Sequence, residues 1–297
     1  VFGNVGALKN LKRRHPDLII GLCGCMMQQQ SIAQKLLKRF PFVDLVFGTN
    51  VLWRLPEMLY EVNEGGRVCL TDEEEYAICE GLPARRLTPY SAYVNITYGC
   101  DNFCTYCIVP FVRGRERSRN IEDIVTECRS LVQDGVTEIT LLGQNVNSYG
   151  KNLSVPVTFA ELLQEVEKID GLERIRFMTP HPKDLSDDLI DVMSKSKKIC
   201  NHVHLPVQSG SNRILKLMNR KYTREWYLDR IAAIRRILPD CGITTDMFSG
   251  FHSETDADFE ETLDLMREVG FDSSFLFKYS ERPGTYASKH LPDDIPE

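Results

Sequence analysis

Apolar and polar residues in the amino-terminal part of the chain alternate between helix-like and strand-like patterns. One expected helix ends at His15, and two further helices cover Ile32–Phe40 and Leu55–Val62. The expected strands cover Leu18–Leu22 and Val43–Gly48. Because strands and helices alternate with short connections, this pattern predicts a small α/β domain with a parallel sheet. Residues 72–89 are acidic and then rich in Pro and Arg; they lack periodicity and are expected to form a linker.

A strand-then-helix pattern repeats along the rest of the chain. The expected strands are Ala92–Thr97, Glu138–Leu142, Arg174–Met178, His202–Val207, Ile243–Phe248 and Ser274–Tyr279. Helices are expected from Ile121 and over Phe159–Ile169, Leu185–Met193, Glu225–Leu238 and Asp258–Val269. The last helix has clear end signals, with Thr255 as N-cap and Gly270 just past its end.

Six β/α units predict a partial TIM-like barrel, whose active site lies at the carboxyl ends of the strands. The fold class is therefore α/β. Residues 86–297 are expected to form a (βα)6 barrel, and residues 1–85 part of a smaller α/β domain plus the linker.

Composition narrows the class of protein. The chain has 297 residues, of which 42% are hydrophobic, enough for one large or two medium domains. A net charge of −6 argues against nucleic-acid binding over the whole surface, so any such contact is expected to be local. The longest apolar runs are too short for a membrane span, so no membrane partner is expected. The chain starts at Val1 rather than Met and stops just after a proline-rich stretch, which we interpret as a fragment lacking both ends.

The ten cysteines are sparse over a long chain, which favours a reducing, cytoplasmic compartment with cysteines as core residues or metal ligands. Cys100, Cys104 and Cys107 form a CxxxCxxC motif directly after the first barrel strand. Thiolates are the ligands of [4Fe–4S] clusters, and three thiolates for four irons leave one iron open to a substrate. Cys128 lies on the core face of an expected helix and is a poor fourth ligand. A zinc site would need a fourth Cys or His close by, and none is placed to supply one.

Polar residues follow the ends of several barrel strands. They are Gln144 and Asn145 after the second strand, Gln208 and Ser209 after the fourth, Asp246 in the fifth and Lys278 in the sixth. Each alone could simply cap a loop. Together they mark the end of the barrel at which the cysteine motif lies.

A CxxxCxxC motif after the first strand of a partial barrel resembles the radical S-adenosylmethionine (SAM) superfamily. The segments Cys107–Arg119, His204–Ser211 and Met218–Thr223, together with Gly24-Cys25-Met26, are similar to the methylthiotransferase family over nearly the whole chain. This resemblance implies SAM on the open iron of the Cys100, Cys104 and Cys107 cluster. It places the amino group of SAM near Gln144 and Asn145, the ribose near Gln208 and Ser209, and the adenine near Lys278. Asp246, in the segment that ends the fifth strand, is also expected to bind SAM.

The resemblance also implies a second, auxiliary [4Fe–4S] cluster. Cys25 matches the third of its ligands, and the first two would lie before Val1. Cys23 does not match a ligand position and is expected to be a strand-core residue. An RNA-binding domain would follow Glu297.

The implied activity is radical SAM-dependent methylthiolation of C2 of N6-isopentenyladenosine 37 in tRNA. The implied partners are a tRNA anticodon stem-loop and an electron donor, with a monomeric state favoured and no acid–base residue assigned. Arg113, Arg115 and Arg119 follow the cysteine motif and are candidates for phosphate contacts. Arg117 could equally pair with Glu116.

Other functions stay open at this point. A sister enzyme could act on N6-threonylcarbamoyladenosine in tRNA, or on a ribosomal protein. A non-catalytic iron–sulfur or zinc protein would have four ligands and no SAM turnover. An RNA-binding scaffold would bind RNA without iron.

Overall fold

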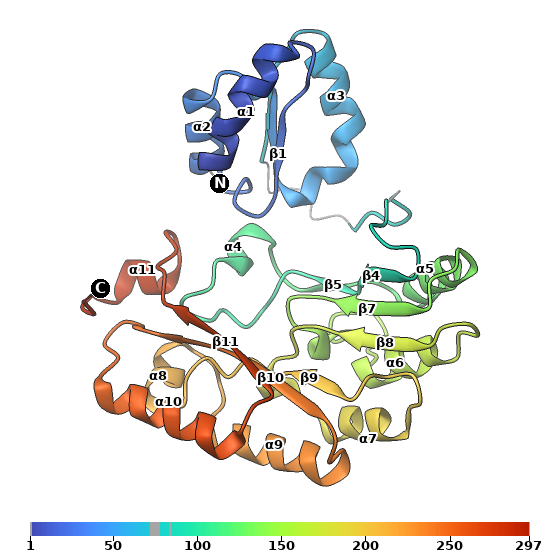
Figure 1. The fold of residues 1–297 in the computed structure, drawn as a ribbon, viewed down its shortest axis with the longest axis vertical. Coiled ribbons are helices and arrows are strands. Elements are labelled where there is room, and N and C mark those ends of the chain that lie inside the picture. Colours follow the sequence, from blue (N-terminus) through green and yellow to red (C-terminus); the bar gives the residue numbers. More distant parts are fainter. Residues whose placement is uncertain (1, 72–77, 83–84, 297) are drawn as a thin grey trace. The chain divides into compact units, whose positions relative to one another are not determined.

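The computed structural model describes residues 2–71, 78–82 and 85–296, and the chain divides into two compact units (Figure 1). Unit 1 comprises Val1–Pro83 with Phe111–Gly114, and unit 2 comprises Ala84–Pro110 with Arg115–Glu297. Within the expected linker, residues 72–77 and 83–84 lie outside the described residues. The described linker residues 78–82 and 85–89 form no helix or strand.

Unit 1 is built on a three-stranded parallel sheet in the order β1-β2-β3. The strands are β1 (Gly21–Cys23), β2 (Leu45–Phe47) and β3 (Val68–Leu70), and the helices are α1 (Phe2–Arg14), α2 (Gln30–Arg39), a 3₁₀ turn η1 (Thr49–Arg54) and α3 (Leu55–Asn63). The three helices confirm the helical periodicity of this part of the sequence. The strand β3 was not expected, because its apolar run Val68–Leu70 is only three residues long, too short for a strand pattern to show.

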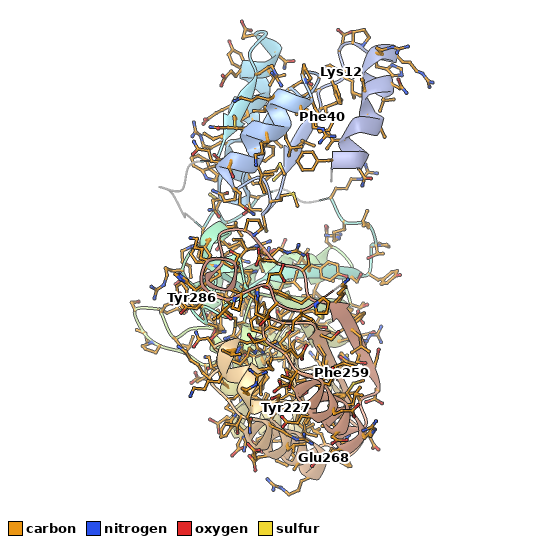
Figure 2. The ribbon with its side chains drawn as sticks, turned by 90° about the vertical axis from the view of Figure 1, so that its left-hand side faces the viewer. Lys12, Phe40, Tyr227, Phe259, Glu268 and Tyr286 are labelled. Atoms are coloured by element: carbon orange, nitrogen blue, oxygen red, sulfur yellow. The ribbon has the colours of Figure 1, made fainter. Side chains whose placement is uncertain are left out.

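The first strand begins later than its apolar run predicts. The Asp44 carboxylate accepts a hydrogen bond from the Ile20 backbone amide at 2.7 Å and forms an ion pair with Lys12 at 3.0 Å. The Ile20 carbonyl accepts from the Asp44 amide, so regular pairing starts only after this residue. Figure 2 labels Lys12, which lies in α1, and Phe40, the C-cap residue of α2 that packs in the core of this unit.

Unit 2 contains six parallel strands that follow the expected repeat. They are β4 (Ser91–Asn95), β7 (Glu138–Leu142), β8 (Arg174–Phe177), β9 (His202–His204), β10 (Gly242–Ser249) and β11 (Ser273–Lys278). They form two three-stranded sheets, β4-β7-β8 and β9-β10-β11. A parallel bridge between Ile175 and Ile199 joins the sheets, so the strands follow one another in chain order around a partial barrel.

The expected amphipathic helices flank these strands (Figure 1). They are α5 (Ile121–Gln133), α6 (Phe159–Glu167), α7 (Asp187–Lys195), α9 (Arg224–Ile237) and α10 (Asp256–Val269). Ile124, Leu162, Ile190, Ile234 and Leu265 from these five helices are fully buried in one core with the strands. Thr255 caps α10 in a capping box with Asp258, and Gly270 ends it at φ 56°, as the sequence predicts.

Several short elements were not expected. They are the hairpin β5 (Thr97–Tyr98) with β6 (Arg117–Ser118), the helices α4 (Val109–Val112), α8 (Asn212–Leu217) and α11 (Tyr286–His290), and the 3₁₀ turns η2 (Val146–Ser148) and η3 (Pro182–Asp184). The strand β9 ends at His204, three residues before its expected end. Pro206 has no amide to donate to the ladder, which interrupts the pairing with β10 until it resumes at the bridge between Gln208 and Met247.

No helix in the described part of the chain is long and apolar enough to cross a membrane.

Candidate active site

The CxxxCxxC loop follows β5 at the carboxyl end of the first barrel strand. Cys100 and Cys104 are buried, and Cys107 is partly buried. The Thr105 amide donates to the Met218 carbonyl at 3.0 Å, and its hydroxyl donates to the Leu217 carbonyl at 2.9 Å. The Ala287 amide donates to the Thr105 carbonyl at 2.9 Å. The short helices α8 and α11 therefore fix the position of the cysteine loop.

The three thiols lie close enough to influence one another. Burial raises the pKa of Cys100 to about 11, opposed by a hydrogen bond at the Asn102 backbone, and the Cys104 thiol adds to the rise. Burial also raises the pKa of Cys107 to about 12, and the thiols of Cys104 and Cys100 contribute to it. Thiols with such pKa values are protonated at neutral pH. Binding to a positively charged metal centre would therefore release their protons and leave thiolate ligands.

Among the described residues, no three His, Cys, Asp or Glu side chains converge as ligands of a single metal ion. In a cubane cluster each thiolate binds a different iron, so the sulfurs stand farther apart than the ligands of one ion. The buried three-thiol loop fits a [4Fe–4S] cluster better than a four-ligand zinc centre.

Aromatic side chains pack behind the cysteine loop. Tyr106 lies edge-on to Phe248, with ring centroids 5.0 Å apart, and Phe248 stacks on Tyr279 at 5.5 Å. Phe251 is fully buried in the same group. Phe103 differs, because it is exposed and lies under the guanidinium of Arg115 at 5.4 Å. Of the two aromatic residues in the motif, only Phe103 is free of this packed group.

Three of the residues expected to bind SAM use their side chains inside the protein. Gln144 accepts a hydrogen bond from the Gly99 amide at 2.6 Å, next to the cysteine loop. Asn145 is buried and donates to Asp184 at 2.8 Å. The Ser209 hydroxyl is fully buried and accepts from the Ser211 amide at 3.2 Å. These bonds position loops at the mouth of the barrel.

The other three lie at the carboxyl side of their strands with more accessible side chains. Gln208 is partly buried, and its backbone amide donates to the backbone carbonyl of Asp246 at 2.9 Å. Asp246 lies within β10, with its carboxylate 3.4 Å from His204 Nε2. Lys278 is exposed at the last position of β11.

The sequence analysis did not single out His181, which follows β8 in the segment Thr179-Pro180-His181. The side chains of Asn145 and Asn147 accept from its backbone amide at 3.2 and 2.8 Å. Its Nδ1 accepts from the Lys183 amide at 3.3 Å, which leaves the proton on Nε2. Nε2 is buried and has no hydrogen-bond partner among the described residues. Burial, followed by the charges of Arg220 and Lys183, holds the pKa of this imidazole well below its usual range.

Arg220 is a second functional candidate that the sequence did not single out. Its guanidinium is buried and donates toward Cys104 Sγ at 3.5 Å and to the Pro206 carbonyl at 2.8 Å. It lies in the segment Met218–Thr223, which carried the family resemblance, but a single arginine gives no sign of burial in a sequence.

The three arginines predicted to contact RNA have different environments. Arg115 is exposed and pairs with Asp101 at 2.6 Å. Arg119 is not a surface residue, which corrects the prediction: it is only 5% exposed, donates to the Asn95 carbonyl at 2.6 Å and pairs with Glu127 at 2.7 Å. Such an arginine cannot reach a phosphate. Arg113 groups with unit 1, where its Nε lies 3.0 Å from Cys25 Sγ.

Cys25 and Cys23 lie at the end of β1 in unit 1. Cys25 is partly buried in the turn that follows the strand. Cys23 is exposed rather than part of the strand core, because β1 is an edge strand of its sheet. The prediction of a core role for Cys23 was therefore wrong.

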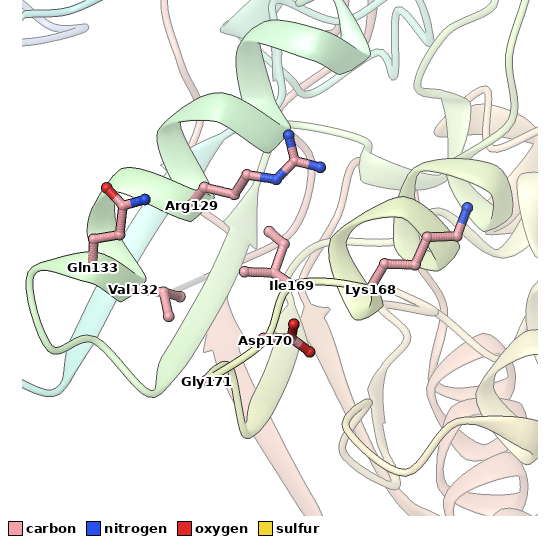
Figure 3. A pocket seen from close by; sticks show the side chains of 7 residues that line it. All are labelled: Arg129, Val132, Gln133, Lys168, Ile169, Asp170 and Gly171. Carbon is pink, nitrogen blue, oxygen red and sulfur yellow. The ribbon is translucent and has the colours of Figure 1, made fainter.

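A surface hollow lies elsewhere on unit 2 (Figure 3). Its lining residues are Arg129, Val132, Gln133, Lys168, Ile169, Asp170 and Gly171. They come from α5 and from the loop that leads into β8, at the amino end of that strand. The hollow is thus at the opposite end of the barrel strands from the cysteine loop, where barrel enzymes do not place their chemistry.

The family model described as the radical SAM superfamily matches residues 94–266. Solved structures share the fold. The radical SAM methyltransferase TsrM from Kitasatospora setae aligns with a TM-score of 0.63 at 14% identity, covering 95% of this chain and 66% of that one. Coproporphyrinogen III oxidase from Escherichia coli aligns with a TM-score of 0.52 at 18% identity, covering 70% and 49%.

Curated relatives share far more sequence. The tRNA-2-methylthio-N6-dimethylallyladenosine synthase of Clostridium tetani is 54% identical over 99% of this chain and 66% of its own length. The synthase of the same name from Carboxydothermus hydrogenoformans is 55% identical over 100% of this chain and 68% of its length. This chain thus spans about two thirds of these relatives. It belongs to the radical SAM superfamily and, within it, to the methylthiotransferase family of these synthases.

Proposed function

We propose that this chain carries the catalytic barrel of a tRNA methylthiotransferase that modifies C2 of N6-isopentenyladenosine 37. The observation that carries the proposal is that two buried thiols and one partly buried thiol lie on one loop at the carboxyl end of the first barrel strand. The names of the curated relatives support the substrate. Residues 86–297 are the radical SAM barrel, and residues 1–85 are part of the preceding domain with its linker.

Cys100, Cys104 and Cys107 would hold the [4Fe–4S] cluster, and SAM would bind its open iron. When bound, the two supply a one-electron reductive cleavage of SAM, chemistry strong enough to remove hydrogen from an unactivated aromatic carbon. An acid–base pair of side chains could not remove this hydrogen, so the proposal uses no side chain as a catalytic acid or base.

In this proposal the residues of this chain bind and orient SAM and shield the cysteine loop from water. Tyr106, Phe248 and Phe251 cover one side of the cysteine loop and exclude water from it. Gln208, Asp246 and Lys278 are our candidates for direct contact with SAM. Gln144, Asn145 and Ser209 act through the loops that they hold.

His181 presents a neutral imidazole with a buried Nε2–H that no described residue accepts. An unsatisfied buried donor costs about 1–3 kcal/mol. A bound acceptor at the barrel mouth would recover that free energy, so His181 is a further candidate for ligand contact.

The proposed partners are a tRNA anticodon stem-loop and an electron donor, in a reducing cytoplasm, with the protein acting as a monomer. Arg115 is the exposed basic residue beside the cysteine loop that is best placed to meet a phosphate. Cys25 would be one ligand of the auxiliary cluster, and Arg113 lies beside its sulfur.

Iron loading tests the cluster directly. Each of Cys100→Ala, Cys104→Ala and Cys107→Ala should lower the iron and acid-labile sulfide that the chain takes up anaerobically. Cys200→Ala is the matched control, since Cys200 is a partly buried cysteine of the same unit. Equal loading in all four variants would overturn the ligand assignment.

A substrate comparison tests the specificity. Stem-loops bearing N6-isopentenyladenosine, N6-threonylcarbamoyladenosine or plain adenosine are incubated with SAM, reductant and the full-length protein, which is loaded with iron and with sulfide as the source of sulfur. Mass spectrometry should detect the gain of one methylthio group in the first alone. A product from the second stem-loop would favour the sister enzyme instead.

A further inference from the structure

Arg220 is a buried cation next to a proposed cluster ligand. It follows α8 and is 5% exposed. Its Nη2 donates to the Pro206 carbonyl at 2.8 Å and its Nε to the Tyr222 hydroxyl at 2.9 Å. Its Nη1 points toward Cys104 Sγ at 3.5 Å and the Tyr106 hydroxyl at 3.4 Å. These bonds fix the plane of the guanidinium and aim one of its edges at the sulfur.

Among the described residues, this charge has no carboxylate as a counterion. No described Asp or Glu forms an ion pair with Arg220, although buried arginines are normally paired with a carboxylate. Its aromatic neighbours Tyr106 and Tyr222 are phenols, which carry no charge at neutral pH. Among its contacts, Cys104 is the one group that becomes an anion when it binds iron.

We infer that Arg220 is a positioning residue for the cluster: it donates an N–H···S hydrogen bond to the Cys104 thiolate and its fixed charge raises the reduction potential of the cluster. This rests on the proposed function, which places a [4Fe–4S] cluster on Cys104.

The direction of the effect follows from electrostatics. Reduction adds one electron to a site that already carries three thiolates, and a nearby cation stabilises the reduced state more than the oxidised one. Hydrogen bonds to the sulfurs and the net charge of the surroundings are established determinants of cluster potentials. Burial strengthens both contributions because little water screens them.

A merely structural role is the alternative. The bonds to Pro206 and Tyr222 join the end of β9 to the segment after α8, and they alone could explain why an arginine is present. Such a role would affect folding but would leave the potential of a correctly loaded cluster unchanged.

The test is an anaerobic redox titration of the iron-loaded protein with dithionite, followed by electron paramagnetic resonance of the reduced cluster. Arg220→Gln should load iron and show a more negative midpoint potential than the wild type. Arg220→Lys keeps the charge but loses the fixed fork, so its potential should fall in between. Arg267→Gln is the matched control for net charge, since Arg267 pairs with Asp264 on the exposed face of α10, and its potential should equal that of the wild type.

An Arg220→Gln potential equal to the wild-type value would overturn the inference and leave the proposed function standing. If Arg220→Gln does not fold, Arg220→Lys decides the question, and an unchanged potential there would overturn the inference. A wild-type chain that takes up no iron would overturn the proposed function, and this inference with it.

Discussion

His181 and Arg220 are buried polar side chains at the barrel mouth that lack the partners such groups usually have. His181 is a buried imidazole whose Nε2–H lacks a described partner, and Arg220 is a buried cation without a described carboxylate. Protein interiors normally satisfy both kinds of group internally. Here the missing partners lie where the cysteine loop and the strand ends meet, which is what a site built for a charged cofactor requires.

The neutral state of His181 has a consequence for stability. Its pKa is lowered in the folded protein, so the unfolded chain binds a proton that the folded chain does not, and stability falls as pH drops below about 6.5. From one such group the loss at pH 5 amounts to about 2 kcal/mol. His181→Gln should therefore lose less stability than the wild type between pH 7 and pH 5 in urea unfolding. Equal losses would mean that His181 takes up a proton while folded.

The two arginines Arg115 and Arg119 should respond differently to substitution. Arg119→Met removes a buried cation that pairs with Glu127 and bonds the Asn95 carbonyl, and should destabilise the protein by about 2–4 kcal/mol. Arg115→Ala removes an exposed pair and should change stability by less than about 1 kcal/mol. It should instead weaken tRNA binding in a salt-dependent way. Thermal unfolding and filter binding measure the two effects, and the reverse pattern would contradict the assignment.

At the scale of elements, the first turns of α10 are hydrogen-bonded to the loop after β9. Asp258 is buried in the capping box with Thr255 and accepts from the Ser211 hydroxyl at 2.6 Å and from Arg213. Gly210 lies so close to the backbone of Glu261 and Thr262 that a Cβ there would clash. The loop that carries Gln208 is thus fixed by the helix.

Asp258→Asn should destabilise the protein by about 1–3 kcal/mol at pH 7. Burial would raise the pKa of Asp258, but the hydrogen bonds from Arg213, Ser211 and Thr255 outweigh it and hold the pKa well below its usual range. A lowered carboxyl pKa contributes stability that is present above about pH 4 and is lost as the pH falls. The difference between variant and wild type should shrink in unfolding experiments below that pH, and a difference that stays constant would count against this account.

The elements that the sequence predicts are those with local signals. The long helices α9 and α10 have apolar periodicity and, for α10, end signals, and the strand β7 has the bounds that its pattern predicts. The helices α8 and α11 and the hairpin of β5 and β6 were missed, because they are too short for periodicity to show. They form through contacts between residues far apart in the chain, such as the Ala287 amide with the Thr105 carbonyl.

The candidate site likewise combines features that have a local sequence signal with features that depend on the surrounding fold. The spacing of Cys100, Cys104 and Cys107 is a local signal with a chemical reason, and it could be read directly. The burial of Arg119 and the unpartnered Nε2 of His181 depend on the fold around them, so the sequence could not supply them.

At the scale of the whole molecule, the chain is acidic while the substrate that we propose for it, a tRNA, is an anion. The net charge of −6 opposes long-range attraction of tRNA, so binding has to rest on local groups such as Arg115 and on the regions that the longer relatives contain. In the proposed function, reductive cleavage of SAM does not depend on that attraction, because it would need the cluster held by the cysteine loop, the strand ends and a reductant, but no tRNA.

That independence defines the decisive measurement. The chain is loaded anaerobically with iron and sulfide, given SAM and dithionite without tRNA, and the 5′-deoxyadenosine formed is quantified by mass spectrometry, with Cys104→Ala in parallel. The account predicts product from the wild type and none above background from the variant. A folded, iron-loaded wild type that forms no 5′-deoxyadenosine, or a variant that forms as much as the wild type, would contradict it.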